Sequence, residues 1–244
     1  MGDLVVREDE GRLCWLTLNR PDKLNALTVE MFRELRRHVQ DLKKNTNVGC
    51  VVLRGAGKCF SAGHDLSDIL AEETPSRGWH SETLRMMEKL PQPVIAAVHG
   101  HCYTGALEMA LAADFIVSSD SAKFADTHAK WAFTPIWGMS QRLPRRIGAA
   151  AAKRLMFTAE TINAHEALRI GLCEAVFQDA DFFTSVREFA APILANSSFS
   201  HAANKRLIEA TDTRSLDAGL QWEIMETEGV GPDVRERLAA FKGK

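Results

Sequence analysis

The cysteines of this sequence show no pairing pattern: Cys14, Cys50, Cys59, Cys102 and Cys173 are odd in number and widely scattered. The chain contains no CxxC pair and no Cys/His spacing typical of a metal site. These absences argue against a disulfide framework and against a zinc centre. We therefore expect five reduced structural thiols, no metal ion and a cytoplasmic protein.

Long apolar runs and an excess of one charge are also missing. No segment is apolar over the length that a bilayer requires, and the opening MGDLVVREDEGRL lacks the basic start and apolar centre of a signal peptide. The formal net charge of −2 gives no electrostatic reason to expect nucleic acid or an anionic membrane as a partner. The 244 residues can bury a substantial core. The composition thus predicts a globular protein with neither kind of partner.

Strand patterns alternate with helix patterns in the first half of the chain. A hairpin is predicted around residues 9–11, and Thr28 is the predicted N-cap of a helix over residues 29–44. Short apolar runs at 49–55, 93–100 and 114–119 are typical of strands buried on both faces. This alternation predicts an α/β fold with parallel strands.

The pattern becomes helical from about residue 139 and is interrupted by one short strand at 173–177. The segment EETPSRGW, residues 72–79, carries a proline and a glycine and is predicted to be a mobile loop. No low-complexity tract or linker separates the two parts. We expect one α/β core followed by a helical C-terminal region.

A turn of small residues precedes a predicted helix in FSAGHDLSDIL, residues 60–70. Gly63 permits a turn or a close approach that a side chain would prevent. Asp65 is the predicted N-cap, which leaves the amide of His64 unpaired near the helix start. The segment either only starts a helix or also presents backbone N–H groups to a negatively charged atom.

A second such turn lies in HGHCYTGALEMALAAD, residues 99–114. Thr104 is the predicted N-cap, and Gly105 leaves its amide open to an approaching group. Glu108 lies in an otherwise apolar helix, so its carboxyl must either be paired with Arg or Lys or have a raised pKa suited to acid–base chemistry. Two such turns can supply two N–H donors to a carbonyl oxygen that becomes an enolate.

These two segments, FSAGHDL and HCYTGALEMALAADFIVSS, resemble the hallmark segments of the crotonase superfamily (enoyl-CoA hydratase/isomerase). LNRPDKLNALTVEMF resembles its N-terminal signature, and KFADTHAKWAFTPIWGMSQRLPRRIG and LMFTAETINAHEALRIGLCEAVF resemble the segments that follow. The resemblance implies an α/β fold with a crotonase-type ββα spiral core over residues 1–190 and a C-terminal helical trimerisation region over residues 191–244. It also implies a homotrimer or a dimer of trimers.

The resemblance assigns a role to four residues. The amides of His64 and Gly105 match the oxyanion donors of the family, and Glu108 matches the first catalytic glutamate of the hydratases. His128 stands where the hydratases have their second catalytic glutamate. Histidine can also accept and donate protons near neutral pH, so His128 is either a catalytic residue, with Asp126 to orient it, or an inert residue in an enzyme of altered chemistry.

An acyl-CoA thioester is the substrate that the resemblance implies, with coenzyme A as part of the substrate and no separate cofactor. The resemblance places CoA near seven residues: Lys23, Leu24, Ala26, Ala62, Gly63, Asp65 and Leu66. Lys23 or Arg20 could offset phosphate charge or stay solvated. Trp131, Phe133 and Trp137 either line an acyl pocket or serve ordinary packing.

Several activities remain open at the level of sequence. Hydration of a 2-enoyl-CoA is the first expectation, with isomerisation, thioester hydrolysis and decarboxylation as alternatives. FSAGHD is similar to the segment of methylmalonyl-CoA decarboxylase, but Pro135 occupies the position of its tyrosine. A catalytically dead scaffold or an RNA-binding relative is the alternative of another class. Basic residues of the first helix would form the RNA face, but Glu30, Glu34 and Asp41 interrupt them, so a solvated face explains them better.

Overall fold

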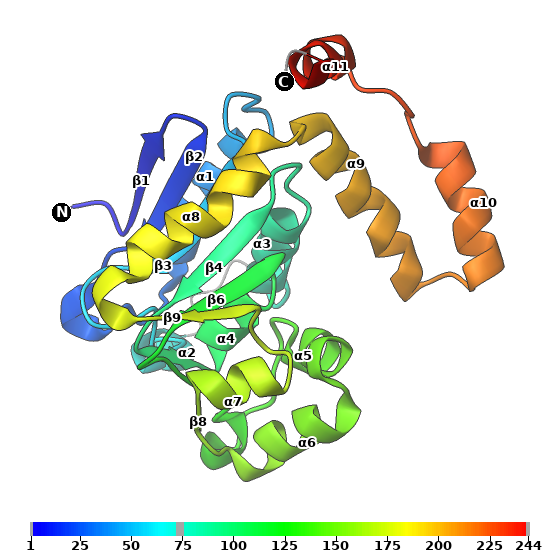
Figure 1. Cartoon of the computed structure of the whole chain (residues 1–244). Coiled ribbons are helices and arrows are strands. Elements are labelled where there is room, and N and C mark those ends of the chain that lie inside the picture. The colour runs from blue at the N-terminus through cyan, green and yellow to red at the C-terminus, as the bar shows by residue number, and fades with distance from the viewer. Residues whose placement is uncertain (1, 72–75, 243–244) are drawn as a thin grey trace.

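The structure is a computed structural model that describes residues 2–71 and 76–242. Its centre is a six-stranded sheet with the strand order β1-β2-β3-β4-β6-β9 (Figure 1). β1 and β2 form the predicted antiparallel hairpin, and the later neighbours pair in parallel, which confirms the α/β class. The strands are β1 (Val5–Glu10), β2 (Leu13–Leu18), β3 (Cys50–Gly55), β4 (Val94–Val98), β6 (Phe115–Ser119) and β9 (Ala175–Phe177).

Side chains of the strands alternate between two apolar cores, one on each face of the sheet. In β2, Cys14 and Leu16 belong to the larger core, whereas Leu13 and Trp15 belong to the smaller one. Helix α8 (Phe182–Ala195) covers the smaller core (Figure 1). The larger core is closed by α1 (Val29–Leu42), α3 (Trp79–Glu88) and α4 (Gly105–Ala110). Because both faces are covered, the central strands are mainly apolar, and β4 is apolar throughout.

A second sheet has three short strands in the order β5-β7-β8. They are β5 (His101–Tyr103), β7 (Lys123–Ala125) and β8 (Ile162–Asn163). Strands of two or three residues are too short to show an apolar period, and the residue patterns did not predict them. β5 leads into α4, and β7 leads into the 3₁₀ turn that begins at His128. This small sheet therefore holds side by side the two segments that carry Glu108 and His128.

The helices begin close to their predicted positions. Thr28 caps α1 as expected, because its Oγ1 accepts a hydrogen bond from the amide of Met31 at 3.2 Å. The helix ends at Leu42 rather than at residue 44. The predicted loop at residues 72–79 lies partly outside the described residues. The remaining α-helices are α2 (Leu66–Ala71), α5 (Met139–Ile147), α6 (Ala149–Thr158), α7 (Ala164–Arg169), α9 (Ser198–Glu209), α10 (Leu216–Glu226) and α11 (Val234–Lys242), and the 3₁₀ turns are η1 (Pro21–Lys23), η2 (His128–Trp131), η3 (Asp179–Asp181) and η4 (Ala210–Asp212).

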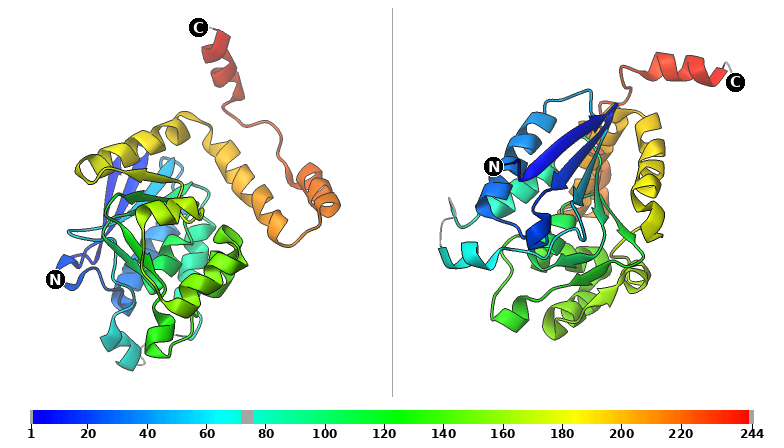
Figure 2. Two further views of the ribbon diagram at one scale, coloured as in Figure 1. Left: turned by 60° about the horizontal axis from the view of Figure 1, so that its bottom comes forward. Right: turned by 90° about the vertical axis from the view of Figure 1, so that its left-hand side faces the viewer.

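The last helices extend away from the two sheets. α9 leaves the end of α8, and α10 and α11 continue as an arm beside the body of the molecule (Figure 2). No residue of α10 is buried. In the part of the chain that the structure describes, no helix is both long and apolar enough to cross a membrane.

The buried side chain of Asn25 joins the segments that approach the site. Its Oδ1 accepts a hydrogen bond from the amide of Arg20 at 2.9 Å, and its Nδ2 donates to the carbonyls of Ala56 and Cys59 at 2.8 Å each. Its own carbonyl accepts a hydrogen bond from the hydroxyl of Ser61. The φ of Asn25 is +52°, in the region that asparagine tolerates better than most residues. Asn25 thus holds together the segments around residues 20, 56–59 and 61, the last of which leads into the turn at Gly63.

We expect Asn25→Ala to lower the free energy of unfolding by about 3 kcal/mol, because one amide and two carbonyls lose their partner in a buried place. Urea denaturation at fixed protein concentration measures the change. Asn204→Ala on the exposed face of α9 is the matched control and should cost less than about 0.5 kcal/mol. An equally small cost for Asn25→Ala would mean that water replaces its amide.

Candidate active site

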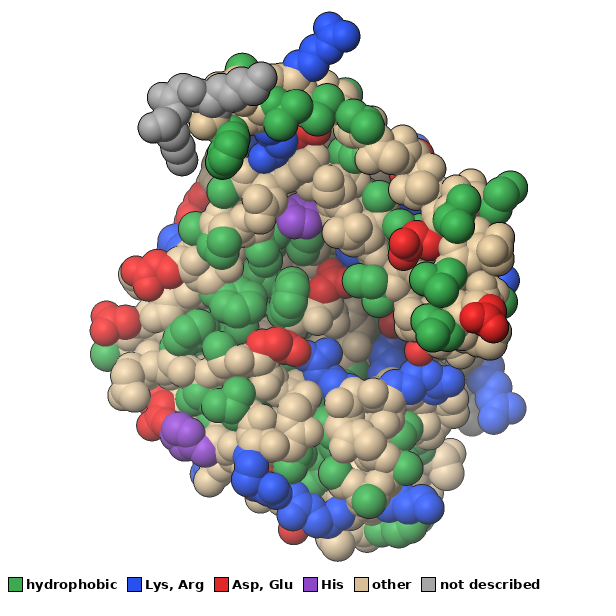
Figure 3. All heavy atoms as spheres, turned by 45° about the vertical axis from the view of Figure 1, so that its right-hand side comes forward, with side chains coloured by type: hydrophobic (Ala, Val, Ile, Leu, Met, Phe, Trp, Pro, Cys, Tyr) green, Lys and Arg blue, Asp and Glu red, His purple; other side chains and the backbone are tan. Residues whose placement is uncertain are grey.

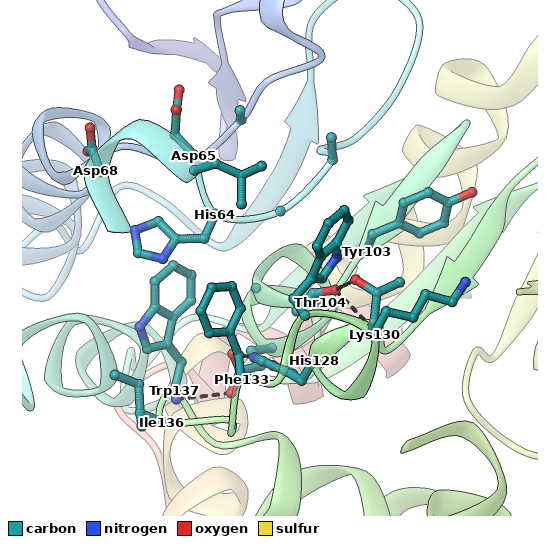
Figure 4. Close-up of a pocket in the computed structure, with 18 of the residues that line it drawn as sticks. His64, Asp65, Asp68, Tyr103, Thr104, His128, Lys130, Phe133, Ile136 and Trp137 are labelled. Carbon is teal, nitrogen blue, oxygen red and sulfur yellow. Dashed lines mark hydrogen bonds and ion pairs between the residues drawn. The ribbon is translucent and has the colours of Figure 1, made fainter. Parts of the chain in front are cut away.

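A cavity of about 970 Å³ opens where three segments of the chain meet (Figure 4). Its lining comes from residues 62–68, 103–108 and 127–137, with Lys23 and Ala26 at its edge. The cavity collects the four residues for which the sequence predicts catalytic roles: His64, Gly105, Glu108 and His128. In residues 2–71 and 76–242, no group of three or more His, Cys, Asp or Glu side chains is placed to bind a metal ion.

The amides of His64 and Gly105 lie close together at the cavity wall. A Cβ on Gly105 would lie 3.3 Å from the nitrogen of His64, and a Cβ on Gly63 would lie 3.6 Å from the nitrogen of Gly105. Leu27 uses the groups on either side of the His64 amide, because its N–H donates to Gly63 and its carbonyl accepts from Asp65. Among the described residues, neither the His64 amide nor the Gly105 amide has a hydrogen-bond acceptor. Both remain free to bind one oxygen of a ligand.

The turn before Gly105 differs from the expected helix cap. Thr104 holds the N-cap position of α4, as predicted, but its side chain makes no capping hydrogen bond. Its hydroxyl lies 2.6 Å from the hydroxyl of Thr127 instead. Trp137 packs over the turn, and a Cβ on Gly105 would meet the indole at 2.6 Å. Position 105 therefore requires glycine both for the open amide and for the close approach of Trp137.

Glu108 is 2% exposed and is held by main-chain amides. Its Oε1 accepts hydrogen bonds from the amides of Trp137 at 2.9 Å and Met139 at 3.0 Å. Its Oε2 lies 3.8 Å from Nε2 of His128, and the described residues place no Arg or Lys within ion-pairing distance of it. Burial raises the pKa of Glu108 above its ordinary value, although the two amides act in the opposite direction. Within the described residues, the structural pairing with Arg or Lys, which the sequence left open, is absent.

His128 is oriented by Asp126, which is itself buried. Nδ1 of His128 lies 2.6 Å from Oδ1 of Asp126, and the His128 amide donates to the same oxygen. Burial by itself lowers the pKa of His128, but the hydrogen bond and charge of Asp126, together with the charge of Glu108, outweigh it and raise the pKa above its ordinary value. Asp126, His128 and Glu108 thus form an Asp–His–Glu series, in which Nε2 of His128 is the nitrogen that faces Glu108.

The His64 side chain belongs to an aromatic wall. Its ring centroid lies 4.8 Å from Trp137 and 5.5 Å from His80, and His80 stacks on Trp137 at 4.7 Å. Burial lowers the pKa of His64 and lowers that of His80 to about 4. Both imidazoles are therefore neutral near neutral pH, so the charge on this side of the cavity comes from the lining carboxylates Asp65 and Asp68.

Most residues predicted to lie near CoA line the cavity. They are Lys23, Ala26, Ala62, Gly63, Asp65 and Leu66. Leu24 is not part of the lining, but its carbonyl accepts a hydrogen bond from the amide of Ala62. The guanidinium of Arg20 donates to Asp65 at 2.9 Å and to the carbonyl of Ala26 at 2.6 Å. Arg20 therefore connects two segments of the cavity wall.

The cavity lining also includes residues that sequence reasoning did not select. Trp131, Phe133 and Trp137 line it, as one of their two interpretations required, and Thr127, Lys130 and Ile136 join them. Phe133 and Ile136 are 41% and 50% exposed at an apolar rim. Their closeness to His128 in the sequence was the available signal for all three additional residues, since Thr127 directly precedes it and Lys130 and Ile136 follow it.

Comparison with known proteins agrees with this architecture. The family described as "Enoyl-CoA hydratase/isomerase" matches residues 8–244. A short-chain-enoyl-CoA hydratase of Clostridium acetobutylicum is 34% identical and aligns over 97% of this chain and 94% of its own. The 1,2-epoxyphenylacetyl-CoA isomerase of Escherichia coli is 30% identical over 100% of this chain and 97% of its own. The crystal structure of an enoyl-CoA hydratase from Bacillus anthracis, 33% identical, gives a TM-score of 0.93 over 98% of this chain and 96% of that one.

The two sheets and the C-terminal helices form the α/β crotonase fold, as the sequence predicted. The chain belongs to the enoyl-CoA hydratase/isomerase (crotonase) family. The names of the two relatives include both a hydratase and an isomerase, so membership by itself does not select one reaction.

We expect Asp126→Asn to lower the pKa of His128, because the neutral amide no longer stabilises the imidazolium by charge. Imidazole NMR titration measures this pKa directly. Asp120→Asn removes a carboxylate that contacts the exposed His165, and it should leave the His128 titration unchanged. If Asp126→Asn leaves that titration unchanged as well, the contact between Asp126 and His128 does not set the pKa.

Proposed function

We propose that the protein binds an acyl-CoA thioester, stabilises its enolate with the amides of His64 and Gly105, and adds water to a 2-enoyl-CoA. The observation that carries the proposal is the 3.8 Å separation between Oε2 of Glu108 and Nε2 of His128, beside two free amides. This separation is too long for a direct hydrogen bond and is suited to one bridging water.

The protonation states define how such a water is held. With Nδ1–H of His128 donated to Asp126, the neutral imidazole presents Nε2 as an acceptor. Glu108 presents a second acceptor, so the two hydrogens of one water point at these side chains. The oxygen lone pairs then face the cavity. This is the orientation that attack on an electrophilic carbon requires.

The reaction balances with these groups alone. The water oxygen forms a bond to C3 of the enoyl group, and one water proton moves to the carboxylate of Glu108. The electrons of the double bond move to the thioester oxygen, where the amides of His64 and Gly105 stabilise the enolate. Glu108 then returns the proton to C2. One such N–H donor typically lowers a barrier by about 3 kcal/mol.

The direction of the pH dependence follows from the role of His128. Protonated His128 presents an N–H donor at Nε2 and no longer accepts a hydrogen bond from the water. Activity is therefore present above the pKa of His128 and is lost as the pH falls through it. Since Asp126 and Glu108 raise this pKa, the loss begins at a higher pH than for an ordinary histidine.

Double-bond isomerisation is the second candidate, because it needs no water. When His128 is protonated, its Nε2–H faces Glu108, and the carboxylate alone can move a proton between two carbons of the acyl chain. The family description, which names an isomerase beside a hydratase, supports this candidate. Thioester hydrolysis and decarboxylation use the same oxyanion site and are outcomes of the substrate test below.

A role in binding without catalysis has less support. The free amides and the Asp–His–Glu series are what catalysis needs, and a scaffold does not need them. On α1, Arg33 and Arg37 lie within ion-pairing distance of Glu30 and Glu34, which reduces the charge available for RNA. The five cysteines are free and buried, which supports the cytoplasmic location that we propose.

The decisive experiment follows 2-enoyl-CoA esters of increasing chain length by mass spectrometry across pH. We expect hydration that is slow on crotonyl-CoA and falls on the acid side of the His128 titration.

Glu108→Gln should reduce kcat by roughly 10³-fold with ester binding retained. His128→Glu should raise hydration near neutral pH, because a carboxylate accepts hydrogen bonds without needing to lose a proton there.

His165→Ala is the matched control, because His165 is exposed and contacts Asp120 outside the cavity. It should leave the rate and its pH dependence unchanged. Equal hydration rates for the wild type and His128→Ala would remove His128 from the mechanism. A shifted double bond without water addition would instead support the isomerase.

The C-terminal region of residues 191–244 is the trimerisation region of the assembly that we propose. Leu216, Leu220 and Ile224 recur every fourth residue along α10 and are 77%, 51% and 69% exposed. Figure 3 shows hydrophobic side chains at the surface of this side of the molecule. An exposed apolar stripe of this kind fits contact with a second copy of the chain, as a homotrimer or a dimer of trimers.

We expect the double variant Leu220→Asp with Ile224→Asp to sediment as a smaller species than the wild type, because two charges would be buried in the contact. Gln221→Asp lies off this stripe and should keep the wild-type mass. Analytical ultracentrifugation separates the two results. A monomeric wild type would refute the assembly without affecting the catalytic proposal.

A further inference from the structure

Thr104 has a backbone conformation that a threonine rarely adopts. Its φ is +52° and its ψ is −107°. Ala132 and Ala159 also have positive φ, but their ψ values of 30° and 31° lie in the ordinary left-handed region. A β-branched residue at the Thr104 angles is strained, whereas glycine would adopt them freely. A threonine here therefore requires a compensating interaction.

The compensation comes from β7 and from the residue that follows Asp126. The amide of Thr104 donates to the carbonyl of Ala125 at 2.8 Å. The hydroxyl of Thr104 accepts a hydrogen bond from the amide of Thr127 at 3.0 Å and lies 2.6 Å from the Thr127 hydroxyl. Glycine could make the first of these contacts and neither of the others.

These contacts join the two segments of the active site. Thr104 directly precedes Gly105, whose amide is one of the two oxyanion donors. Thr127 lies between Asp126 and His128, the pair that faces Glu108. Both threonines line the cavity, and Figure 4 labels Thr104 there.

We propose that Thr104 is a positioning residue, whose hydroxyl holds the Gly105 amide and the His128 imidazole at a fixed separation. The role of this separation in catalysis rests on the proposed function. The strain at Thr104 is the cost of placing a hydroxyl where the turn alone would favour glycine. The hydroxyl acts on the substrate only through Gly105 and His128.

The test uses the full-length protein and pairs two substitutions of Thr104. Thr104→Gly accepts the backbone angles and lacks the hydroxyl, whereas Thr104→Ser keeps it. We expect Thr104→Gly to lower kcat by roughly 10–100-fold with little change in KM, because the reacting groups lose their spacing while the CoA contacts stay. Thr104→Ser should retain kcat within about threefold of wild type. Adding Thr127→Val to Thr104→Gly should lower kcat little further, because both substitutions remove the same contact between the two hydroxyls.

An NMR measurement keeps this proposal separate from the proposed function. The imidazole nitrogens of His128 should shift in Thr104→Gly and stay at their wild-type positions in Thr104→Ser, whichever acyl-CoA reaction the enzyme catalyses. Ala159→Gly also removes a positive-φ side chain, at the end of α6, and should change neither the spectrum nor kcat. A wild type inactive on every ester would refute the proposed function and leave this measurement intact.

Two results would overturn the role of Thr104. One is a Thr104→Gly protein with wild-type kcat and unshifted His128 nitrogens. The other is an equal loss of kcat in Thr104→Ser and Thr104→Gly, accompanied by a loss of folded protein, since that would show a purely structural requirement.

Discussion

The buried carboxylate of Glu108 is the constraint on which the arrangement of the site depends. A carboxylate that is 2% exposed must find donors, and the amides of Trp137 and Met139 supply two at one oxygen. Those amides belong to the segment that runs from His128 into α5, so satisfying Glu108 folds that segment back over α4. The same fold-back lays the indole of Trp137 over Gly105 and closes the deep side of the cavity.

In the proposed function, the second oxygen of Glu108, Oε2, is the one that faces His128 and takes part in proton transfer. It faces an imidazole whose other nitrogen is hydrogen-bonded to Asp126, so in the proposed reaction the proton at Nε2 decides between a bound water and an internal ion pair. His64 and His80 are different, because burial keeps both neutral. The three histidines near this cavity thus differ: Asp126 and Glu108 raise the pKa of His128, whereas burial lowers those of His64 and His80.

How much of the fold and of the site could be predicted depends on how far apart in the sequence the interacting residues lie. The hairpin, the Thr28 cap and the buried strands follow from local patterns, and the structure has them where the sequence predicted them. The proximity of His64, Gly105, Glu108 and His128 was expected from resemblance to a family, since no local period brings residues 64 and 128 together. Thr104 holds the predicted N-cap position, but the partner of its hydroxyl could not be predicted, because Thr127 lies 23 residues away. The three-stranded sheet was not predicted, because its strands are too short to show an apolar period.

The proposed oxyanion donors at His64 and Gly105 belong to the main chain, whereas the proposed proton-transfer groups belong to side chains. A change of side chain at position 64 leaves its N–H in place, so the capacity to hold an enolate survives most substitutions that alter the cavity. The fate of that enolate depends instead on a few side chains, chiefly those at positions 108 and 128. On such a fold, a point substitution of a side chain can change the reaction, while the main-chain amides still bind the thioester oxygen.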